Sequence, residues 1–212
     1  MEPTPPELGA ATGSPHGLIV EGREELLYLL GEAAEVEHAA CCIYLYAAFT
    51  LRAEPGDGLT AAQVPAVAGW KRGINRIALQ EMIHLALVNN LLAALGGAPR
   101  LGRHNLPQRS PYAPEIRLTL APFSEQTLRR FLYIERPEGM DISSIAGELD
   151  HDRPAPPVPT GPLVLPAPQA FSSVGQLYRG IEWGLRGLVD RYGEERVFVG
   201  SPNAQASTRY FR

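Results

Sequence analysis

The sequence predicts a mainly α-helical protein, a bundle of helices joined by long proline-rich loops. Two observations support this prediction. The segments between the helical stretches are rich in proline and glycine, residues that end helices and form loops. Apolar residues recur at helical spacing over three long segments, at about Gly22–Leu51, Pro65–Leu95 and Ser173–Arg191.

Composition indicates a single cytoplasmic domain. The 212 residues are 45% hydrophobic, enough for a sizeable core. The 19 basic and 23 acidic residues form no basic stripe, which argues against nucleic acid or an anionic membrane as a partner. The longest apolar run, Ala39–Phe49, is too short to span a bilayer, and the first residues lack the features of a signal peptide. Cys41 and Cys42 are neighbours and predict no disulfide framework.

We expect two parts along the chain. Residues 1–20 are rich in proline, glycine, serine and threonine, which is typical of a flexible N-terminal tail. Residues 21–212 form one helical domain. This domain contains a proline-rich insertion at about 152–170, which includes Pro154–Pro168 and is expected to be irregular.

Caps and turns set the limits of the shorter elements. Gly96 and Gly97 follow the second long helix and are typical of a helix C-terminus. Residues 98–123 contain several prolines and predict turns with short extended pieces. Ser124 can cap a short helix over Glu125–Ile134, because its hydroxyl can accept a hydrogen bond from a free backbone N–H of the first turn.

Two polar residues lie on the apolar face of the second long helix. At about 100° per residue, Glu81 lies at the centre of an apolar stripe and His84 lies inside the same stripe. A buried carboxylate beside a buried imidazole is costly unless something pairs with both groups. The apolar members of this stripe are Trp70, Ile74, Ile77, Leu85, Val88, Leu91, Leu92 and Leu95.

The other long helices also carry acids near their apolar faces. On the first helix, Glu37 is central in the apolar stripe, whereas Glu35 lies on the opposite side and is expected to be solvated. On the third, Glu182 lies near the edge of the stripe. Because Arg179 and Arg186 flank Glu182, a structural salt bridge is an alternative to a role in a shared site.

A helical Glu-x-x-His pair with inward glutamates from other helices is the pattern of carboxylate-bridged metal sites in helical bundles. Carboxylates are hard oxygen donors, imidazole suits divalent iron, and the charge of the metal offsets the cost of burying acids. The pattern therefore predicts a divalent metal, iron or alternatively manganese. Tyr44 and Tyr178 are either core aromatics or catalytic residues whose hydroxyls line the pocket. The predicted ligands are Glu37, Glu81, His84 and Glu182.

Four segments resemble the ferritin-like domain of the iminophenyl-pyruvate dimer synthase family, which includes imine-coupling enzymes of bisindole biosynthesis. The resemblance extends over about residues 22–200 and implies a ferritin-like helical bundle, metal binding and a place in secondary metabolism. Carried over by position, it implies the same four ligands. The segments are "EVEHAACCIYLYAAF", "IALQEMIHLALVNNLLAALGGAPR", "FLYIERPEG" and "VGQLYRGIEWGL".

The sequence departs from the family in two places. Cys41 and Cys42 stand where the family has a proline pair. The family continues into another long helix with a Gln-Gly-Glu-Gly stretch and a later histidine, and neither occurs here. We therefore expect the last bundle helix to be missing and an apolar groove to associate as a homo-oligomer or within a larger enzyme. The missing helix leaves the number of metal ions open: a complete two-metal site, a one-metal site and a defective site are the alternatives. The expected groove residues are Leu30, Ala33, Leu91, Leu95 and Val189.

Three functions from different classes follow from these patterns. The first is a metal-dependent oxidoreductase or synthase that acts on a small amino-acid-derived substrate. The second is a non-catalytic metal-binding or structural subunit of a larger assembly. The third is a purely structural helical protein whose acids pair with arginines. Metal analysis separates the third from the others, and turnover separates the first from the second.

Overall fold

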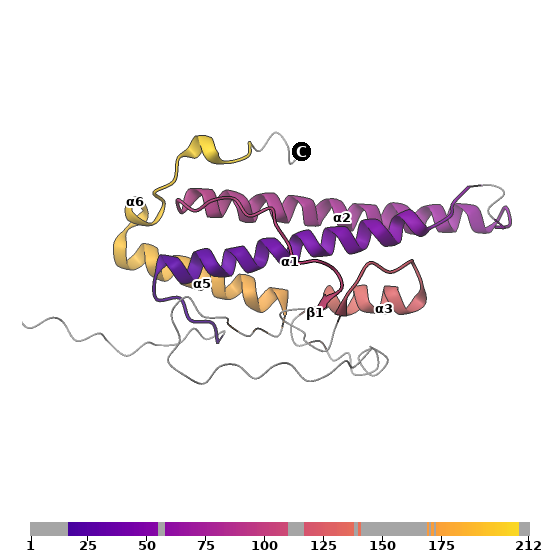
Figure 1. Cartoon of the computed structure of the whole chain (residues 1–212), viewed down its shortest axis with the longest axis horizontal. Helices are drawn as coiled ribbons and strands as arrows, with labels where there is room; N and C mark the ends of the chain where they lie inside the picture. The colour runs from indigo at the N-terminus through magenta and orange to yellow at the C-terminus, as the bar shows by residue number, and fades with distance from the viewer. Residues whose placement is uncertain are drawn as a thin grey trace, which may run out of the picture.

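The structure is a computed structural model that describes residues 17–54, 58–109, 117–137, 140, 169, 171 and 173–207. It is mainly α-helical, as predicted (Figure 1). The expected proline-rich segment Pro154–Pro168 lies outside the described residues. The long helices are α1 (Arg23–Thr50), α2 (Gln63–Ala94) and α5 (Val174–Tyr192). The short elements are β1 (Gln108–Arg109), β2 (Arg117–Leu118), α3 (Glu125–Ile134), α6 (Glu194–Val197) and a 3₁₀ turn at Pro202–Ala204.

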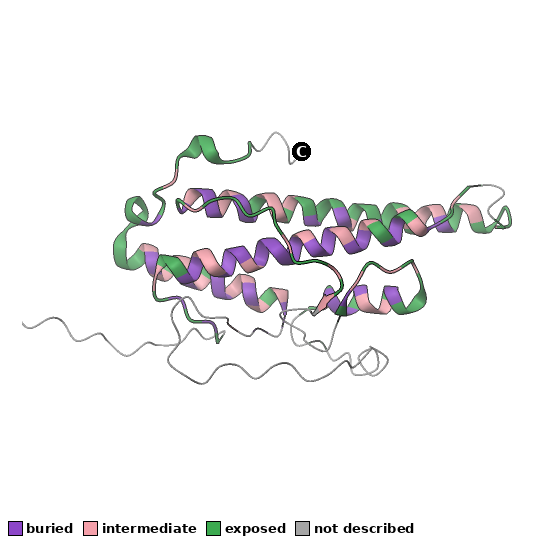
Figure 2. Ribbon diagram, viewed as in Figure 1, coloured by how far each residue is buried: buried purple, intermediate pink, exposed green. Residues whose placement is uncertain are grey.

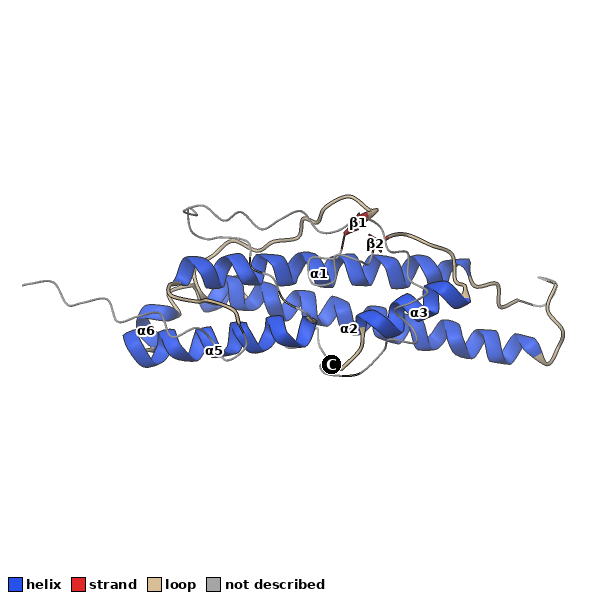
Figure 3. Ribbon diagram, turned by 90° about the horizontal axis from the view of Figure 1, so that it is seen from below, coloured by secondary structure: helices blue, strands red, loops and turns tan. Residues whose placement is uncertain are grey.

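In the view of Figure 1, the helices form three rows with α1 in the middle: the antiparallel α2 lies along one side of α1, while α5 and α3 lie end to end along the other. In the turned view of Figure 3, α1 runs along one edge of the bundle, and α2 and α5 both lie below it. Strands β1 and β2 pair antiparallel in the loop region before α3. Because α1 has helices on two sides, buried residues occur around much of its circumference (Figure 2).

The predicted helices are confirmed, with ends that differ by at most about two residues from the sequence-based limits. The side chain of Ser124 accepts a hydrogen bond from the backbone N–H of Thr127, and Ser173 caps α5 in the same way. Gly96 ends α2 with a φ of 78°, a conformation that glycine adopts without steric cost. Cys41 and Cys42 are both free thiols.

The first described residues are not part of a flexible tail. We expected residues 1–20 to be mobile, but Leu18 is 0% and Val20 is 7% exposed, and both belong to the core. They lie against Gly180 and Gly184 of α5, where a side chain would leave no room for them. The expectation was wrong for residues 17–20, because composition does not reveal a groove on another helix.

We expect Gly180→Ala to destabilise the fold. A Cβ atom at this position would lie 2.3 Å from Cδ1 of Leu18, so the N-terminal segment would have to move. Overpacking of this kind costs roughly 1–3 kcal/mol. Gly187→Ala in the same helix is the matched control: no described atom lies within 4 Å of the added Cβ. This control should stabilise α5 by up to about 1 kcal/mol. Urea unfolding measures the change in unfolding free energy of each variant. If Gly180→Ala and Gly187→Ala change it equally, the packing argument is contradicted.

Glu35 is buried, although the helical wheel placed it on the solvated side of α1. It is 6% exposed. Its carboxylate accepts a hydrogen bond from Nε of Arg100 at 2.8 Å, and Nδ1 of His104 lies 2.5 Å from its other oxygen. The backbone N–H of Arg100 in turn donates to Asn89 of α2. The prediction was wrong because the loop after α2 folds over this face of α1.

The expected apolar groove is not open. Leu30, Ala33 and Leu95 are at most 1% exposed, so they belong to the interior of the bundle. Large exposed apolar residues are spread over α1, α2, α3 and the loops. They include Trp70 of α2, which was expected to face inward but is 55% exposed and stacks against Phe123. The oligomeric state stays a prediction.

Within the described residues, α2 is the one helix that is long and apolar enough to cross a membrane by length and composition. This is weak evidence for a membrane span, because core helices of soluble proteins have the same length and composition.

Candidate metal centre

Helices α1 and α2 bring three of the four predicted ligands together. Glu81 and His84 are three residues apart on α2, and therefore lie on one face of the helix, directly opposite Glu37 of α1. Nδ1 of His84 lies 3.2 Å from a carboxylate oxygen of Glu81 and 3.4 Å from one of Glu37. One ligand atom from each residue lies within 4.8 Å of the other two, close enough for one cation to contact all three.

The three side chains differ sharply in exposure. The carboxylates of Glu37 and Glu81 are 3% and 9% exposed, whereas the His84 ring is 50% exposed. Two buried acids side by side repel each other and lose hydration, which makes the cluster costly unless a proton or a cation joins it. The site is therefore built for positive charge.

The raised pKa values of His84 and Glu81 favour protons in this role when no metal is bound. Hydrogen bonds to Glu37 and then Glu81 raise the pKa of His84 to about 10. Burial, aided by the charge of Glu37, raises the pKa of Glu81 to about 7. Burial also acts to raise the pKa of Glu37, but hydrogen bonds from His84, Glu81 and Tyr178 outweigh it and lower this pKa.

We expect the metal-free protein to lose stability as the pH rises from about 5 to about 9. The pKa values of Glu81 and His84 are higher in the folded chain than their usual values of 4.5 and 6.5, so over this range the folded state binds more protons than the unfolded state. Stability from these protons is complete at the acid end and lost as each group deprotonates. Unfolding in EDTA across this range measures the effect.

His84→Gln is the control, because it removes the larger of the two shifts and should make the pH dependence shallower. Added Mn²⁺ should show the opposite trend. Since the metal competes with the same protons, its stabilising effect should grow as the pH rises. A pH dependence unchanged in His84→Gln would contradict the assignment of these protons.

Two tyrosines each hold one carboxylate of the site. The hydroxyl of Tyr178, from α5, donates to Glu37, and the hydroxyl of Tyr44, from α1, donates to Glu135. Burial is the main cause that raises the pKa of Tyr178, so this hydroxyl stays protonated and keeps donating at neutral pH. Of the two tyrosines predicted to line a pocket, Tyr178 lies in the lining of the cavity described below, whereas Tyr44 is a fully buried core residue outside that lining.

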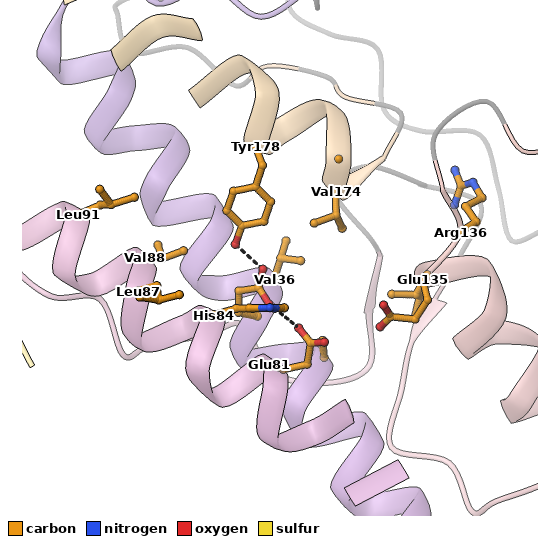
Figure 4. Close-up of a pocket in the computed structure, with 14 residues that line it drawn as sticks. Val36, Glu81, His84, Leu87, Val88, Leu91, Glu135, Arg136, Val174 and Tyr178 are labelled. Carbon is orange, nitrogen blue, oxygen red and sulfur yellow. Dashed lines mark hydrogen bonds and ion pairs between the residues drawn. The ribbon is translucent and has the colours of Figure 1, made fainter. Parts of the chain in front are cut away.

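Glu135 is a site residue that the sequence analysis missed. It follows the last residue of α3, and its carboxylate faces Glu81 in Figure 4. Burial raises its pKa, and the nearby negative charge of Glu81 raises it further, whereas Tyr44 and His84 act in the opposite direction. The helical wheel could not select Glu135, because the residue lies beyond the end of a short helix. The sequence did contain one indication that Glu135 belongs to the site: the residue lies in "FLYIERPEG", one of the four segments that resemble the dimer synthase family.

Glu182 does not join the cluster. Its side chain is 59% exposed and accepts a hydrogen bond from Nη2 of Arg186 at 2.6 Å, one turn along α5. The structure therefore follows the alternative that the sequence left open, a surface ion pair, which contributes little to stability. In its place, α5 provides Tyr178 to the site.

The cluster forms one wall of a cavity of about 450 Å³. This cavity lies where the end of α3 and the start of α5 meet beside α1 and α2 (Figures 1 and 4). Its size is typical of sites for small molecules, and most of its lining is apolar. The apolar residues are Val36, Ala40, Leu87, Val88, Leu91, Ile134 and Val174, and the polar ones are Glu37, Glu81, His84, Glu135, Arg136 and Tyr178.

Inward carboxylates and a histidine, placed beside an apolar cavity in a helical bundle, define the class of carboxylate-rich bundle proteins. The model of the family described as Ferritin-like matches residues 30–212. The chain belongs to the Ferritin-like family.

The chain is also similar to a curated protein, the 2-imino-3-(indol-3-yl)propanoate dimerase of Chromobacterium violaceum, with 29% identity over 212 residues. The alignment covers 90% of this chain but 19% of the relative, so the chain spans about a fifth of the relative's length. No solved structure matches the chain.

Proposed function

We propose that the chain binds one divalent metal ion, iron or manganese, through Glu37, Glu81 and His84, and that this centre acts on a small amino-acid-derived substrate in an oxidative or imine-coupling reaction. The observation that carries the proposal is the set of three donor atoms within 4.8 Å of one another in the wall of a cavity. The name of the similar curated protein, a dimerase of an imino acid, supports the substrate class.

The residues fit such a metal on chemical grounds. Two carboxylates and one imidazole are donors that divalent iron and manganese accept. The pair of buried acids, with one pKa raised to about 7, would gain a compensating charge from the cation. When bound, the metal would supply a redox-active or Lewis-acid centre beside the cavity.

The surrounding residues have distinct roles in this proposal. Tyr178 holds Glu37 in one orientation, and Tyr44 does the same for Glu135, so both tyrosines act as positioning residues. Glu135, with a pKa raised by burial, can hold or accept a proton next to the cavity. The apolar wall excludes water from one side of a bound substrate.

A second candidate function is metal binding without turnover, as a subunit of a larger assembly. The specific observation in its favour is that the chain corresponds to about a fifth of its curated relative, so the activity of the whole relative need not lie in the matching part.

Metal analysis and turnover together test the proposal. We expect protein purified without chelator, or loaded anaerobically with Fe²⁺, to hold close to one ion per chain by mass spectrometry, and Glu37→Gln/Glu81→Gln to hold almost none. Oxygen consumption with imines formed from aromatic 2-oxo acids then tests the reaction. Metal without turnover would favour the second candidate. A wild-type protein without bound metal would refute both.

A further inference from the structure

The wall of the cavity contains a carboxylate that is not part of the candidate metal centre, that of Glu135. Glu37, Glu81 and His84 supply the three donor atoms that lie within 4.8 Å of one another. Glu135 follows α3 and lines the same cavity, and its carboxylate faces Glu81 in Figure 4. Because Glu135 is an exposed residue, a molecule in the cavity can reach this carboxylate.

Tyr44 holds the Glu135 carboxylate in one position. The Tyr44 side chain is fully buried and packs edge-on against Phe131 of α3, with the two ring centroids 4.5 Å apart. Its hydroxyl donates a hydrogen bond to Oε1 of Glu135. Within the described part of the chain no group donates to Oε2, although a carboxylate can accept about four hydrogen bonds in all. The carboxylate is therefore oriented before a ligand arrives, and it can still accept hydrogen bonds from one.

Glu135 makes no salt bridge with any described residue. Arg136 is the only arginine or lysine among the described residues of the lining, but Figure 4 shows its guanidinium directed away from Glu81 and His84. This guanidinium contacts Tyr133: its Nη1 donates to the backbone carbonyl at 2.8 Å, and its Cζ lies 3.9 Å from the ring centroid. The carboxylate of Glu135 is thus available to a cation that enters the cavity.

A bound metal ion would leave Glu135 as the unbalanced charge of the cavity. The two positive charges of a divalent ion match the negative charges of Glu37 and Glu81, and His84 would bind the ion in its neutral form. Burial and then the charge of Glu81 raise the pKa of Glu135. Because the ion would offset the charge of Glu81, it would remove the second cause and favour the ionised carboxylate. An ionised carboxylate forms its strongest hydrogen bonds with cationic N–H donors.

We propose that Glu135 binds a positively charged nitrogen of the substrate, an ammonium or iminium group, and so selects cationic molecules over neutral molecules of the same shape. The apolar part of such a molecule lies against the apolar lining, which includes Leu91 and Val174. This inference rests on the proposed function, because it names the substrate class of that site and the residue that recognises it.

A matched pair of probes, tryptamine and indole-3-ethanol, tests the inference. The two have nearly the same shape, but at pH 7 only tryptamine carries a positive charge. With wild-type protein saturated with Mn²⁺, in the absence of oxygen, calorimetry should show tryptamine binding about tenfold more tightly than the alcohol, or better. Equal affinities for the two probes would overturn the proposal.

Variants of two glutamates assign the preference to one side chain. Glu135→Gln should remove the preference for tryptamine and leave the affinity for indole-3-ethanol unchanged, because glutamine keeps the shape and loses the charge. Glu135→Asp should keep part of the preference, since it retains the charge on a shorter side chain. Glu182→Gln is the matched control: Glu182 pairs with Arg186 outside the cavity lining, so the preference should persist. A preference that persists in Glu135→Gln would overturn the proposal.

The metal content of the same samples separates this inference from the proposed function. We expect Glu135→Gln to hold one Mn²⁺ per chain at saturation, and thermal unfolding checks that the variant is folded. If Glu135→Gln loses the ion together with the preference, Glu135 is a metal ligand and its role in substrate recognition is overturned. A wild-type protein that binds no metal would refute the proposed function. The two probes, compared in EDTA on the wild type and Glu135→Gln, would then still decide whether Glu135 recognises a cation.

Discussion

Replacing Glu81 with glutamine is expected to abolish metal-dependent stabilisation without weakening the metal-free fold. If the wild-type protein binds Mn²⁺ as proposed, the ion at about 100 times its dissociation constant should add about 2.7 kcal/mol of stability. For a chain of this length this corresponds to a rise in Tm of roughly 5–10 °C. The variant lacks one of three donors, so Mn²⁺ should leave its Tm almost unchanged. Differential scanning calorimetry with EDTA or with Mn²⁺ measures both states.

The metal-free comparison gives this prediction its second test. At pH 8, Glu81 is above its raised pKa of about 7 and carries a charge that burial disfavours. Glutamine keeps the shape and removes the charge, so the variant in EDTA should be at least as stable as the wild type. A variant that is destabilised in EDTA and still responds fully to Mn²⁺ would show that Glu81 is structural.

Two further glutamates serve as controls for the assignment of ligands. Glu182→Gln should retain the full response to Mn²⁺, because the structure pairs Glu182 with Arg186 on the surface of α5. Glu135→Gln should weaken the response, because Glu135 faces the cluster and influences the pKa environment of the site. The reverse result would favour the ligand set predicted from the sequence, which includes Glu182, over the three residues that the structure brings together.

Replacing Arg100 with alanine is expected to cost about 3 kcal/mol of folding stability. The change leaves the buried carboxylate of Glu35 without its main partner, and an unpaired buried charge typically costs roughly 3–5 kcal/mol. His104 remains within 2.5 Å of Glu35 and offsets part of the loss, so we expect the lower end of this range. The corresponding fall in Tm is roughly 6–12 °C.

Two variants separate the charge from the volume of the Arg100 side chain. Glu35→Gln/Arg100→Ala should recover much of the lost stability, because it removes the charge that the single variant leaves unpaired. Arg129→Ala breaks an exposed ion pair with Glu125 on α3 and should cost less than about 1 kcal/mol. If the double variant is no more stable than Arg100→Ala, the cost comes from lost packing and not from the buried charge.

Local sequence patterns were sufficient to predict the long helices and the three residues at the centre of the site. The spacing of apolar residues located α1, α2 and α5, because a helix repeats every 3.6 residues whatever surrounds it. The same periodicity placed Glu37 and Glu81 on inward faces, where the structure has them. It also placed His84 inward, but the His84 side chain is 50% exposed. A carboxylate central in an apolar stripe must point at another element, so these three residues could be brought together from the sequence alone.

The contacts of these residues depend on the tertiary structure. A helical wheel gives the direction in which a side chain points from its own helix, but it does not show which segment of the chain lies in that direction. Glu35 was predicted to be solvated, yet Arg100, 65 residues away, covers it. Tyr44 reaches Glu135 across 91 residues, and Tyr178 reaches Glu37 across 141. Glu182, at the edge of its stripe, could face either the site or solvent, and the position of α5 turned it outward. The sequence by itself determined the helices and the three donor residues that meet between α1 and α2. The packing of α3, α5 and the loop after α2 decided which groups surround those donors, because contacts between distant segments exist only once the chain has folded.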